Sequence, residues 1–278
     1  MFEPYAFFFR QKWPSGFFCP RCCFPDAYVI RTRKQPLYQC KTCRHQTSLT
    51  AGTVMEGTRT PLFKWAAAIR YLSMPGSINA LQLSRRIDVT YKTAWAMLMK
   101  IRQALTAADE AFRLRGRVTC AVAYYGRPNV HFIRHPQEHP VIVAIGTPSN
   151  GEPSYVKIQC IPDRHLDDKW LLRSGKDDFA QKHVHPASVV AFLNRVQYHR
   201  SFVLPPLFNR AKTWINRTFH GIGPKYLQQY WDEYCFRANR SWQELPTRDA
   251  LASICMRTPK GPQPFKLHFG WKRELLAG

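Results

Sequence analysis

The sequence predicts a multidomain α/β protein, and three observations support this fold class. Two pairs of closely spaced cysteines lie near the N-terminus, apolar residues then recur with the spacing of helices, and from about residue 118 they recur with the spacing of strands. We expect a small metal-binding domain over residues 1–55, a helical domain and linker over 56–117, a mixed α/β core over 118–256 and a tail over 257–278.

The first segment contains two Cys-x-x-Cys motifs, Cys19/Cys22 and Cys40/Cys43, separated by seventeen residues. This spacing is typical of a four-cysteine zinc ribbon, in which each motif supplies two thiolates to one tetrahedral ion. Four protein ligands leave no open position for a substrate, so we expect a structural zinc ion. Disulfides are less consistent with nine cysteines and no recognisable secretory signal. Cys23 is an alternative ligand, but only Cys22 has the correct spacing.

The composition indicates a folded, strongly basic protein. Lysine and arginine outnumber acidic residues by 41 to 18, which gives a net charge of +23. Such an excess favours a polyanionic partner, because basic side chains contact phosphates and release counterions. We predict double-stranded DNA as the partner; a generally basic surface is the simpler alternative. No apolar run approaches the roughly 18–20 residues that span a bilayer. We therefore expect a cytoplasmic, nucleoid-associated protein without a membrane partner.

Three helices are predicted between the cysteines and residue 117. Pro61 begins the first, which ends before Pro75, while Ser77 and Thr90 are candidate N-caps for the second and third. The second and third helices, joined by a short turn at Asp88, resemble a helix-turn-helix, whose second helix enters the major groove of DNA by its N-terminal end. A plain three-helix bundle with cationic faces is the alternative.

Basic and polar residues at three places are candidate DNA contacts. The first place is the tip of the hairpin between the cysteine pairs. The second is the end of the second helix, where arginines suit the phosphate backbone, and the third is the third helix. The candidates are Arg31, Arg33 and Lys34 at the tip, Arg85 and Arg86 on the second helix, and Tyr91, Lys92, Thr93, Lys100 and Arg102 on the third.

The core is predicted to begin with antiparallel strands and to continue with alternating helix and strand. We expect strands over residues 118–133, interrupted by a turn at Gly126, and then over 141–145 and 155–161. A helix over 166–183, a short strand over 188–193 and two helices beyond residue 208 are expected to follow. This order is compatible with an RNase H-like domain. An aromatic stripe on the last helix is expected to pack in the core: Tyr226, Leu227, Tyr230, Trp231 and Tyr234.

Short motifs throughout the chain resemble those of one protein family. They are CKTCRHQTSLTAGT at residues 40–53, TRTPL at 58–62, ALQL at 80–83, YKTAW at 91–95, KTW at 212–214, HG at 220–221, KYL at 225–227 and FRANR at 236–240. With these motifs the chain resembles bacterial insertion-sequence transposases that join an N-terminal zinc ribbon, a helix-turn-helix and an RNase H-like DDE core. In active members, the resemblance implies DNA transposition by phosphoryl transfer.

The core departs from this family at the positions that should hold divalent ions. Phosphoryl transfer by this route uses two metal ions, which require two aspartates and a third polar or acidic ligand. The resemblance places Ala121, Leu193 and Arg210 at these positions, where no side chain offers an oxygen to Mg²⁺. We therefore expect no Mg²⁺ at the core and no catalysis, with the core retained as a scaffold or a partner surface.

Two alternatives concern the same core. An active transposase would need relocated metal ligands, and a non-catalytic subunit would use the core to bind a protein partner or a second copy. The candidate relocated ligands are Asp163, Asp167, Asp168, Asp177 and Asp178. His131, His135 and His139 recur every four residues, but Pro136 and Pro140 exclude a continuous helix there, so we interpret them as loop histidines.

Overall fold

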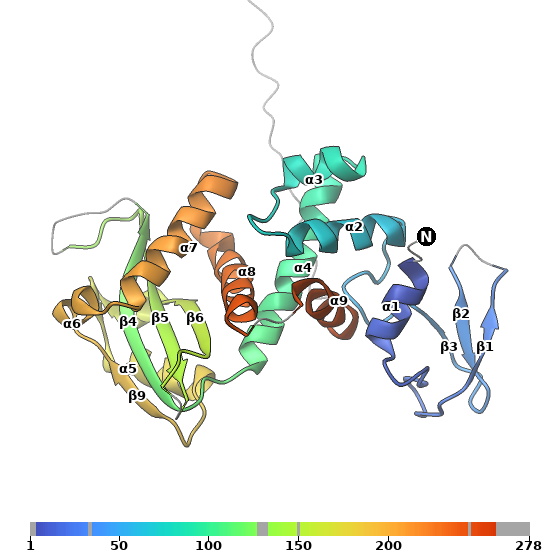
Figure 1. The fold of residues 1–278 in the computed structure, drawn as a ribbon, viewed down its shortest axis with the longest axis horizontal. Coiled ribbons are helices and arrows are strands. Elements are labelled where there is room, and N and C mark those ends of the chain that lie inside the picture. Colours follow the sequence, from blue (N-terminus) through green and yellow to red (C-terminus); the bar gives the residue numbers. More distant parts are fainter. Residues whose placement is uncertain (1–3, 33–34, 127–132, 149–150, 244–245, 260–278) are drawn as a thin grey trace, which may run out of the picture.

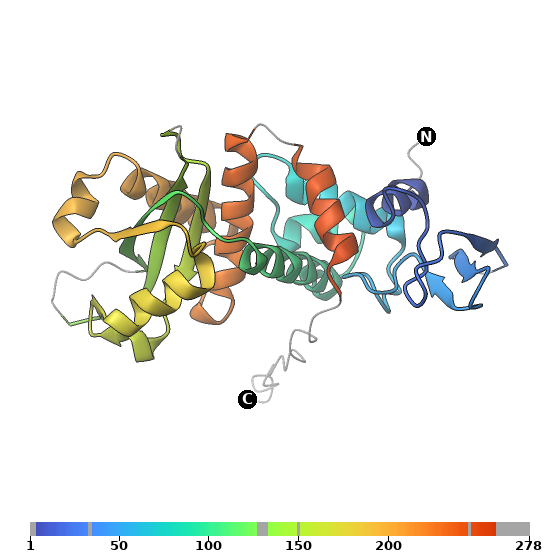
Figure 2. The same cartoon turned by 90° about the horizontal axis from the view of Figure 1, so that it is seen from below.

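The computed structural model describes residues 4–32, 35–126, 133–148, 151–243 and 246–259. The molecule is elongated, with a three-stranded ribbon at one end, a group of helices in the middle and a four-stranded sheet with its own helices at the other end (Figures 1 and 2). The long helix α4 (Tyr91–Ala111) runs from the helical group to the sheet. None of the described helices has both the length and the apolar character needed to cross a bilayer.

The ribbon is an antiparallel sheet preceded by a helix that the sequence analysis did not predict. Its strands, in spatial order, are β1 (Ala27–Ile30), β2 (Leu37–Cys40) and β3 (Gln46–Ser48). Helix α1 (Pro4–Lys12) leads into Trp13, whose ring meets that of Tyr38 on β2 edge-on, with ring centroids 5.1 Å apart. This aromatic contact attaches the ribbon to the helical part of the chain.

The three predicted helices are present as α2 (Leu62–Ser73), α3 (Ala80–Ile87) and α4. As predicted, Thr90 caps α4, because its hydroxyl accepts a hydrogen bond from the backbone N–H of Thr93 at 3.2 Å. The predicted cap of α3 is wrong. Asn79 and Gln82 form a capping box at that helix, whereas the hydroxyl of Ser77 donates to the buried carboxylate of Glu233 at 2.6 Å.

The last described helix, α9 (Thr247–Arg257), returns to the helical group. Leu251 and Cys255 are buried in the same apolar cluster as residues of α1, α2, α3 and α4. The backbone carbonyl of Cys255 also accepts a hydrogen bond from the N–H of Val54 at 3.2 Å. The boundary expected at residue 256 therefore does not separate two packing units, because α9 belongs with the N-terminal helices.

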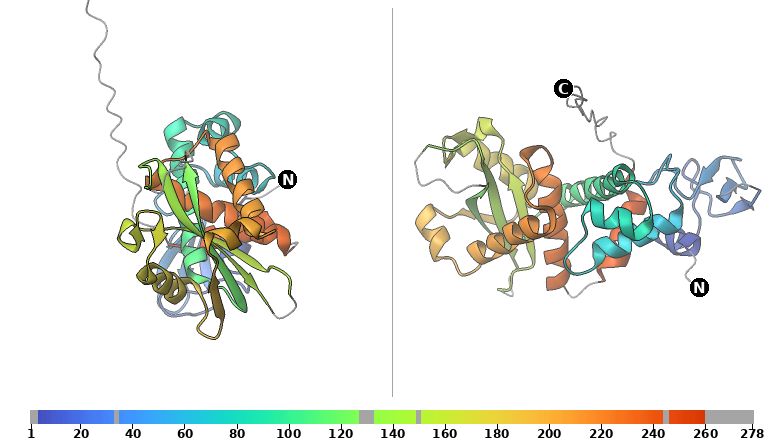
Figure 3. Two further views of the ribbon diagram at one scale, coloured as in Figure 1. Left: turned by 90° about the vertical axis from the view of Figure 1, so that its left-hand side faces the viewer. Right: turned by 90° about the horizontal axis from the view of Figure 1, so that it is seen from above.

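The core contains a four-stranded mixed sheet. Three consecutive strands pair antiparallel with their neighbours, and a fourth strand, later in the chain, pairs parallel with the first of them in the sequence. In spatial order they are β6 (Tyr155–Cys160), β5 (Glu138–Thr147), β4 (Arg117–Gly126) and β9 (Val189–Phe192). Helices cover both faces (Figure 3). They are α7 (Leu204–Phe219) and α8 (Pro224–Trp242) on one face and α5 (Arg173–His183) on the other.

Successive side chains of β4 point to opposite faces of the sheet, so this one strand contributes to the apolar core on each face. Ala121 and Ala123 pack in the cluster that includes α7 and α8, whereas Val118 and Cys120 pack in the cluster that includes Phe179 of α5. The predicted aromatic stripe also packs here: Tyr230 and Trp231 are buried, and Tyr226, Leu227 and Tyr234 pack in the same cluster. The sheet is thus a sandwiched layer with a continuous core on each side.

Two predictions for the core segments differ from the structure. The segment expected to be helical over 166–183 begins with a small hairpin, β7 (Leu166–Asp167) and β8 (Trp170–Leu171), because Asp168 turns the chain with a φ of +48°. Only residues 173–183 are helical. The strand expected to end at residue 133 falls largely on residues 127–132, outside the described ranges, and the next strand observed begins at Glu138. The short helix α6 (Arg195–Arg200) precedes α7.

Side-chain amides of α8 pair with the outer edge of β6. Asn239 accepts from the backbone N–H of Val156 at 2.7 Å and donates to the carbonyl of the same residue at 3.1 Å. Gln228 accepts from the N–H of Cys160 at 2.8 Å and donates to the carbonyl of Ile158 at 3.0 Å. An exposed strand edge carries unpaired backbone groups that promote association, and these amides remove that exposure.

Buried charges connect α4 to α8 and to the sheet. The guanidinium of Arg102 contacts the carboxylate of Glu233 at 2.7 Å, and these side chains are 1% and 0% exposed. About one turn further along α4, Thr106 donates to Asp232 at 2.6 Å. Nearer its C-terminus, Asp109 pairs with Lys157 of β6 at 3.0 Å. The helical group is therefore fixed to the sheet by specific polar contacts.

We predict that Asn239→Ala lowers the free energy of unfolding by about 2 kcal/mol, because the buried N–H and C=O of Val156 would both lose their partner. Urea denaturation followed by circular dichroism measures this change. Gln243→Ala is the control, since Gln243 is exposed and makes one long bond to the carbonyl of Ser154 at 3.4 Å. Its expected effect is below about 0.5 kcal/mol. Equal losses in both variants would show that the amide pairing does not stabilise this edge.

Candidate metal centre and nucleic-acid interface

The two Cys-x-x-Cys motifs converge at one end of the ribbon. The Sγ atoms of Cys19 and Cys43 are 3.5 Å apart, as are those of Cys22 and Cys40, and all four lie within 4.8 Å of one another. A tetrahedral ion with Zn–S bonds of about 2.3 Å holds its sulfur atoms roughly 3.8 Å apart. The arrangement of the four thiols therefore fits one zinc ion.

Both cysteine motifs form the same kind of turn. The N–H of Cys23 donates to the carbonyl of Cys19 at 2.9 Å, and the N–H of Arg44 donates to that of Cys40 at 3.2 Å. Cys23 and Arg44 both have left-handed backbone conformations, with φ of +60° and +59°. Cys23 therefore occupies the position that follows a ligand pair, as Arg44 does, and it is outside the four-thiol group.

Backbone N–H groups prepare the buried thiols to bind a cation as thiolates. Burial raises the pKa of Cys19, but hydrogen bonds from the N–H groups of Cys22 and Arg21 outweigh it and lower the pKa to about 7. At Cys40, burial raises the pKa, but hydrogen bonds from the N–H groups of Cys43 and Thr42, together with the neighbouring thiols, outweigh it and lower the pKa. Since four protein thiolates complete a tetrahedron, the predicted structural zinc ion is confirmed by the chemistry and geometry of this site.

The N-terminal end of α4 is a basic and polar surface. Tyr91 is 48% exposed, Lys92 is exposed and Thr93 is half-buried. The first N–H groups of a helix and its dipole favour an anion at such an end. Arg85 and Arg86 are exposed on α3, on the other side of the turn. The predicted candidates on these two helices thus lie close together around one turn.

A hollow of about 270 Å³ lies beside this end of α4. Lys92, Thr93 and Lys100 line it from α4, and Thr58 and Thr60 line it from the segment that precedes α2. Lys100 is half-buried, with its ammonium group 5.9 Å from the centroid of the Trp65 ring. The hollow therefore combines two ammonium groups with hydroxyl groups, a combination that suits phosphate or base-edge contacts.

The prediction that Arg102 contacts DNA is wrong. Arg102 lies on the buried face of α4, where it pairs with Glu233 and its guanidinium carbon lies 4.1 Å from the centroid of the Tyr230 ring. At the ribbon tip, Arg31 is exposed, as a backbone contact would require. Arg33 and Lys34 lie outside the described residues, so only Arg31 of this group has a described position.

Two of the three core positions expected to hold metal ligands are neighbours in the structure. Leu193 follows β9, and its N–H donates to the carbonyl of Cys120 at 2.8 Å, which places it beside Ala121 on the neighbouring strand. Ala121 is fully buried, and Leu193 packs on the same apolar cluster as Leu207 and Phe208 of α7. Arg210 is exposed on α7, one turn beyond these residues. This part of the core is filled by hydrocarbon rather than by oxygen atoms.

Three of the five alternative acidic ligands pair with separate basic side chains. Asp163 pairs with Arg134 at 2.7 Å, Asp177 with Arg173 at 3.8 Å and Asp178 with Lys182 at 2.8 Å. Within the described ranges, the four cysteines are the one group of three or more cysteine, histidine or acidic side chains close enough to share an ion. His135 and His139 are not part of such a group, and His131 is not among the described residues.

The sequence analysis missed a set of arginine and aromatic side chains between α7 and α8. Arg210 and Trp214 come from α7, and Tyr234, Arg237 and Trp242 come from α8. Arg210 and Trp214 are four residues apart and Tyr234 and Arg237 are three apart, which is a signal that each pair shares a helix face. That signal was interpreted only for the apolar face of α8, and the sequence did not show that the two helices face each other.

Comparisons with known proteins agree with the ribbon and point to mobile elements. Residues 2–46 match the family described as the transposase zinc-ribbon domain. A protein described as "Uncharacterized protein in transposable element ISH50", from Halobacterium salinarum, is 34% identical over 100 residues, which is 34% of this chain. The match covers 33% of that relative, so it spans about a third of its length. Together these matches support a relationship to the transposase family of insertion sequences.

We predict that the purified protein contains about one zinc ion per chain and that Cys40→Ser loses it together with the fold of the ribbon, because the ion supplies much of the stability of such a small domain. Elemental analysis and circular dichroism measure the two effects. Cys23→Ser is the matched control and should retain the metal. A folded, metal-free preparation, or metal loss in Cys23→Ser, would contradict this assignment of ligands.

Proposed function

We propose that this chain, with its transposase-type zinc ribbon, is a sequence-preferring DNA-binding protein whose core does not catalyse phosphoryl transfer. The observation that carries the proposal is the contrast between two places in the molecule. The N-terminal end of α4 is basic and accessible, whereas the position of the expected metal ligands contains the hydrocarbon side chains of Ala121 and Leu193. The proposed location of the protein is the nucleoid, in the cytoplasm.

The helices α3 and α4 are proposed to act as a helix-turn-helix. In such a motif the second helix approaches base edges by its N-terminus. Tyr91, Lys92 and Thr93 lie at that end of α4, and the exposed Arg85 and Arg86 of α3 can contact the phosphate backbone. The overall charge of +23 supports association with a polyanion. The proposed partner is therefore double-stranded DNA, with Arg31 and Lys100 as further contacts.

The core is proposed to be an RNase H-like domain that has lost its metal site. Three antiparallel strands with a fourth strand parallel to the first are consistent with this fold. Ala121 lies on β4 and Leu193 directly follows the neighbouring parallel strand β9, where two carboxylates would share metal ions. Hard cations require oxygen ligands, and the guanidinium of Arg210 would repel them. The described aspartates are too dispersed to form a substitute site.

A second candidate function is that of a subunit that binds a protein through the core. Phe202, between α6 and α7, is 95% exposed, and Val196 on α6 is 58% exposed. Neighbouring exposed apolar side chains favour a contact with another protein or with a second copy of the chain. Analytical ultracentrifugation with and without DNA distinguishes an assembly formed by the protein alone from one formed only on DNA.

We predict that Lys92→Ala reduces affinity for the preferred duplex by about tenfold and reduces the preference over random duplex, because Lys92 is proposed to contact base edges. Arg31→Ala should weaken binding to all duplexes alike, since a phosphate contact carries no sequence information. Selection from a random duplex library followed by fluorescence anisotropy measures both effects. Equal loss of preference in the two variants would argue against a recognition helix at α4.

We also predict that neither Mg²⁺ nor Mn²⁺ supports cleavage or joining of DNA that carries the preferred sequence near its end. Gel electrophoresis of end-labelled DNA checks this outcome. Metal-dependent cleavage by the unmodified chain that disappears in Asp163→Ala or Asp168→Ala would instead establish an active enzyme with relocated ligands. Lys182→Ala, which removes a cation from α5, would serve as the control for such a loss.

A further inference from the structure

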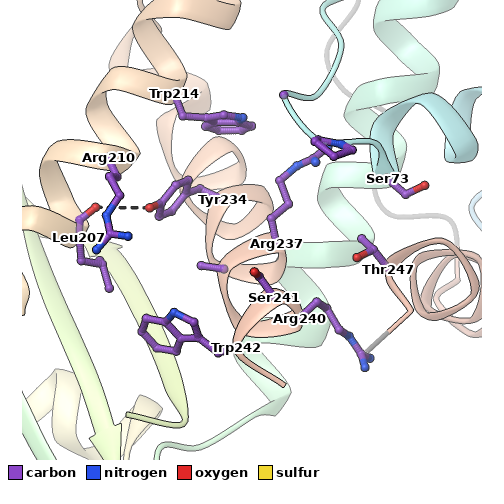
Figure 4. A pocket seen from close by; sticks show the side chains of 13 residues that line it. Ser73, Leu207, Arg210, Trp214, Tyr234, Arg237, Arg240, Ser241, Trp242 and Thr247 are labelled. Atoms are coloured by element: carbon purple, nitrogen blue, oxygen red, sulfur yellow. Dashed lines mark hydrogen bonds between the residues drawn. The ribbon is translucent and has the colours of Figure 1, made fainter. Parts of the chain in front are cut away.

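A groove of about 510 Å³ lies between the sheet-covering helices and the N-terminal helical group (Figure 4). Arg210 and Trp214 of α7 and Tyr234, Arg237, Arg240 and Trp242 of α8 line it on the side of the sheet. The connection between α2 and α3 and the start of α9 line the other side. The groove therefore lies where the two parts of the molecule meet, and none of its lining residues belongs to the zinc ribbon.

The charged side chains that line the groove are all arginines. The described residues of its lining include no aspartate or glutamate. Arg237 is held in place, since its Nη1 donates to the carbonyl of Met74 at 2.8 Å and its Nε to Glu233 at 3.2 Å. Among the described residues, Arg210 and Arg240 have no carboxylate partner, so their charges are available to an anion in the groove. The chemistry favours a ligand with more than one negative charge.

Aromatic rings accompany these charges. The rings of Trp214 and Tyr234 lie 5.8 Å apart, and the guanidinium of Arg237 lies 5.9 Å from the Trp214 centroid. Trp242, the last residue of α8, is 40% exposed and is one of the residues that line the groove (Figure 4). Flat aromatic faces next to guanidinium groups form the combination that holds unpaired bases and their phosphates.

We propose that this groove binds an unpaired stretch of nucleic acid, with phosphates on Arg210 and Arg240 and bases stacked on Trp242. Paired bases inside a duplex are stacked on one another, so apart from the outer faces of the terminal pairs only unpaired bases can present their faces to a tryptophan. Arg210 stands where the family resemblance expects a metal ligand, and here its guanidinium contacts phosphate directly instead of through an ion. The inference rests on the proposed nucleic-acid-binding function but assigns a different ligand and a different surface.

Binding of a fluorescent twelve-nucleotide oligothymidine and of a blunt duplex of preferred sequence, measured by anisotropy, tests the proposal. Trp242→Ala should weaken oligothymidine binding by about tenfold, the effect of losing one stacked base, and leave duplex binding unchanged. Trp242→Phe should retain most of the affinity, because a ring remains. Arg210→Gln should weaken binding and reduce its dependence on salt. Trp170→Ala is the matched control, since Trp170 is 66% exposed on β8, away from the groove.

Three results would overturn the inference. They are unchanged oligothymidine affinity in Trp242→Ala, an equal loss for oligothymidine in Trp170→Ala, and stronger competition by a doubly phosphorylated peptide than by unlabelled oligothymidine. The proposed recognition helix is tested separately, because Lys92→Ala should weaken duplex binding alone. If Lys92→Ala behaves as expected while Trp242→Ala has no effect, only the groove assignment fails; the reverse pattern removes only the recognition helix. Unchanged circular dichroism and melting temperature establish that each variant is folded.

Discussion

The buried ion pair between Arg102 and Glu233 determines how the two parts of this molecule are placed. Removing both charges from water is costly, and the cost is offset only if the partners and their other hydrogen bonds are in place. Burial raises the pKa of Glu233, but the guanidinium groups of Arg102 and Arg237 outweigh it and hold the pKa below its ordinary value. Ser77 adds a further hydrogen bond. Three elements therefore contact one carboxylate: the α2–α3 connection, α4 and α8. This contact fixes the position of α4 and of the two sides of the arginine-lined groove.

The parts predicted from sequence are those with local signals. Cysteine spacing located the zinc site, and Thr90 located the start of α4, because each signal lies within a few residues of the structure it specifies. Arg102 was misassigned for the opposite reason. It falls four residues after the buried Leu98, so the sequence could have placed it on the buried face of α4. Its partner Glu233, however, is 131 residues away in the sequence. Helix α1 was not predicted, and the segment of α9 was assigned to the core domain. Both helices are buried by contacts with each other and with residues distant in the sequence, which no local pattern shows.

The core positions show what a change from carboxylate to hydrocarbon does to a buried site. Side chains of aspartates at Ala121 and Leu193 would face each other across neighbouring strands and would need cations to offset their repulsion. With alanine and leucine, the same space joins the apolar cluster under α7, so packing takes over the stabilising role that metal ions have in a carboxylate site. A core of this kind can remain folded independently of divalent ions, while Arg210 at its edge adds a positive charge.

The two edge strands of the sheet differ in whether another strand could pair with them. At β6 the backbone groups are saturated by Asn239 and Gln228, so another strand would first have to displace two buried amides. At β9, the described residues place no strand on the outer side, and Val189 is 69% exposed. A strand from another chain would thus extend the sheet only beside β9. For two copies that met edge to edge, the sheet would therefore continue through β9 and not through β6.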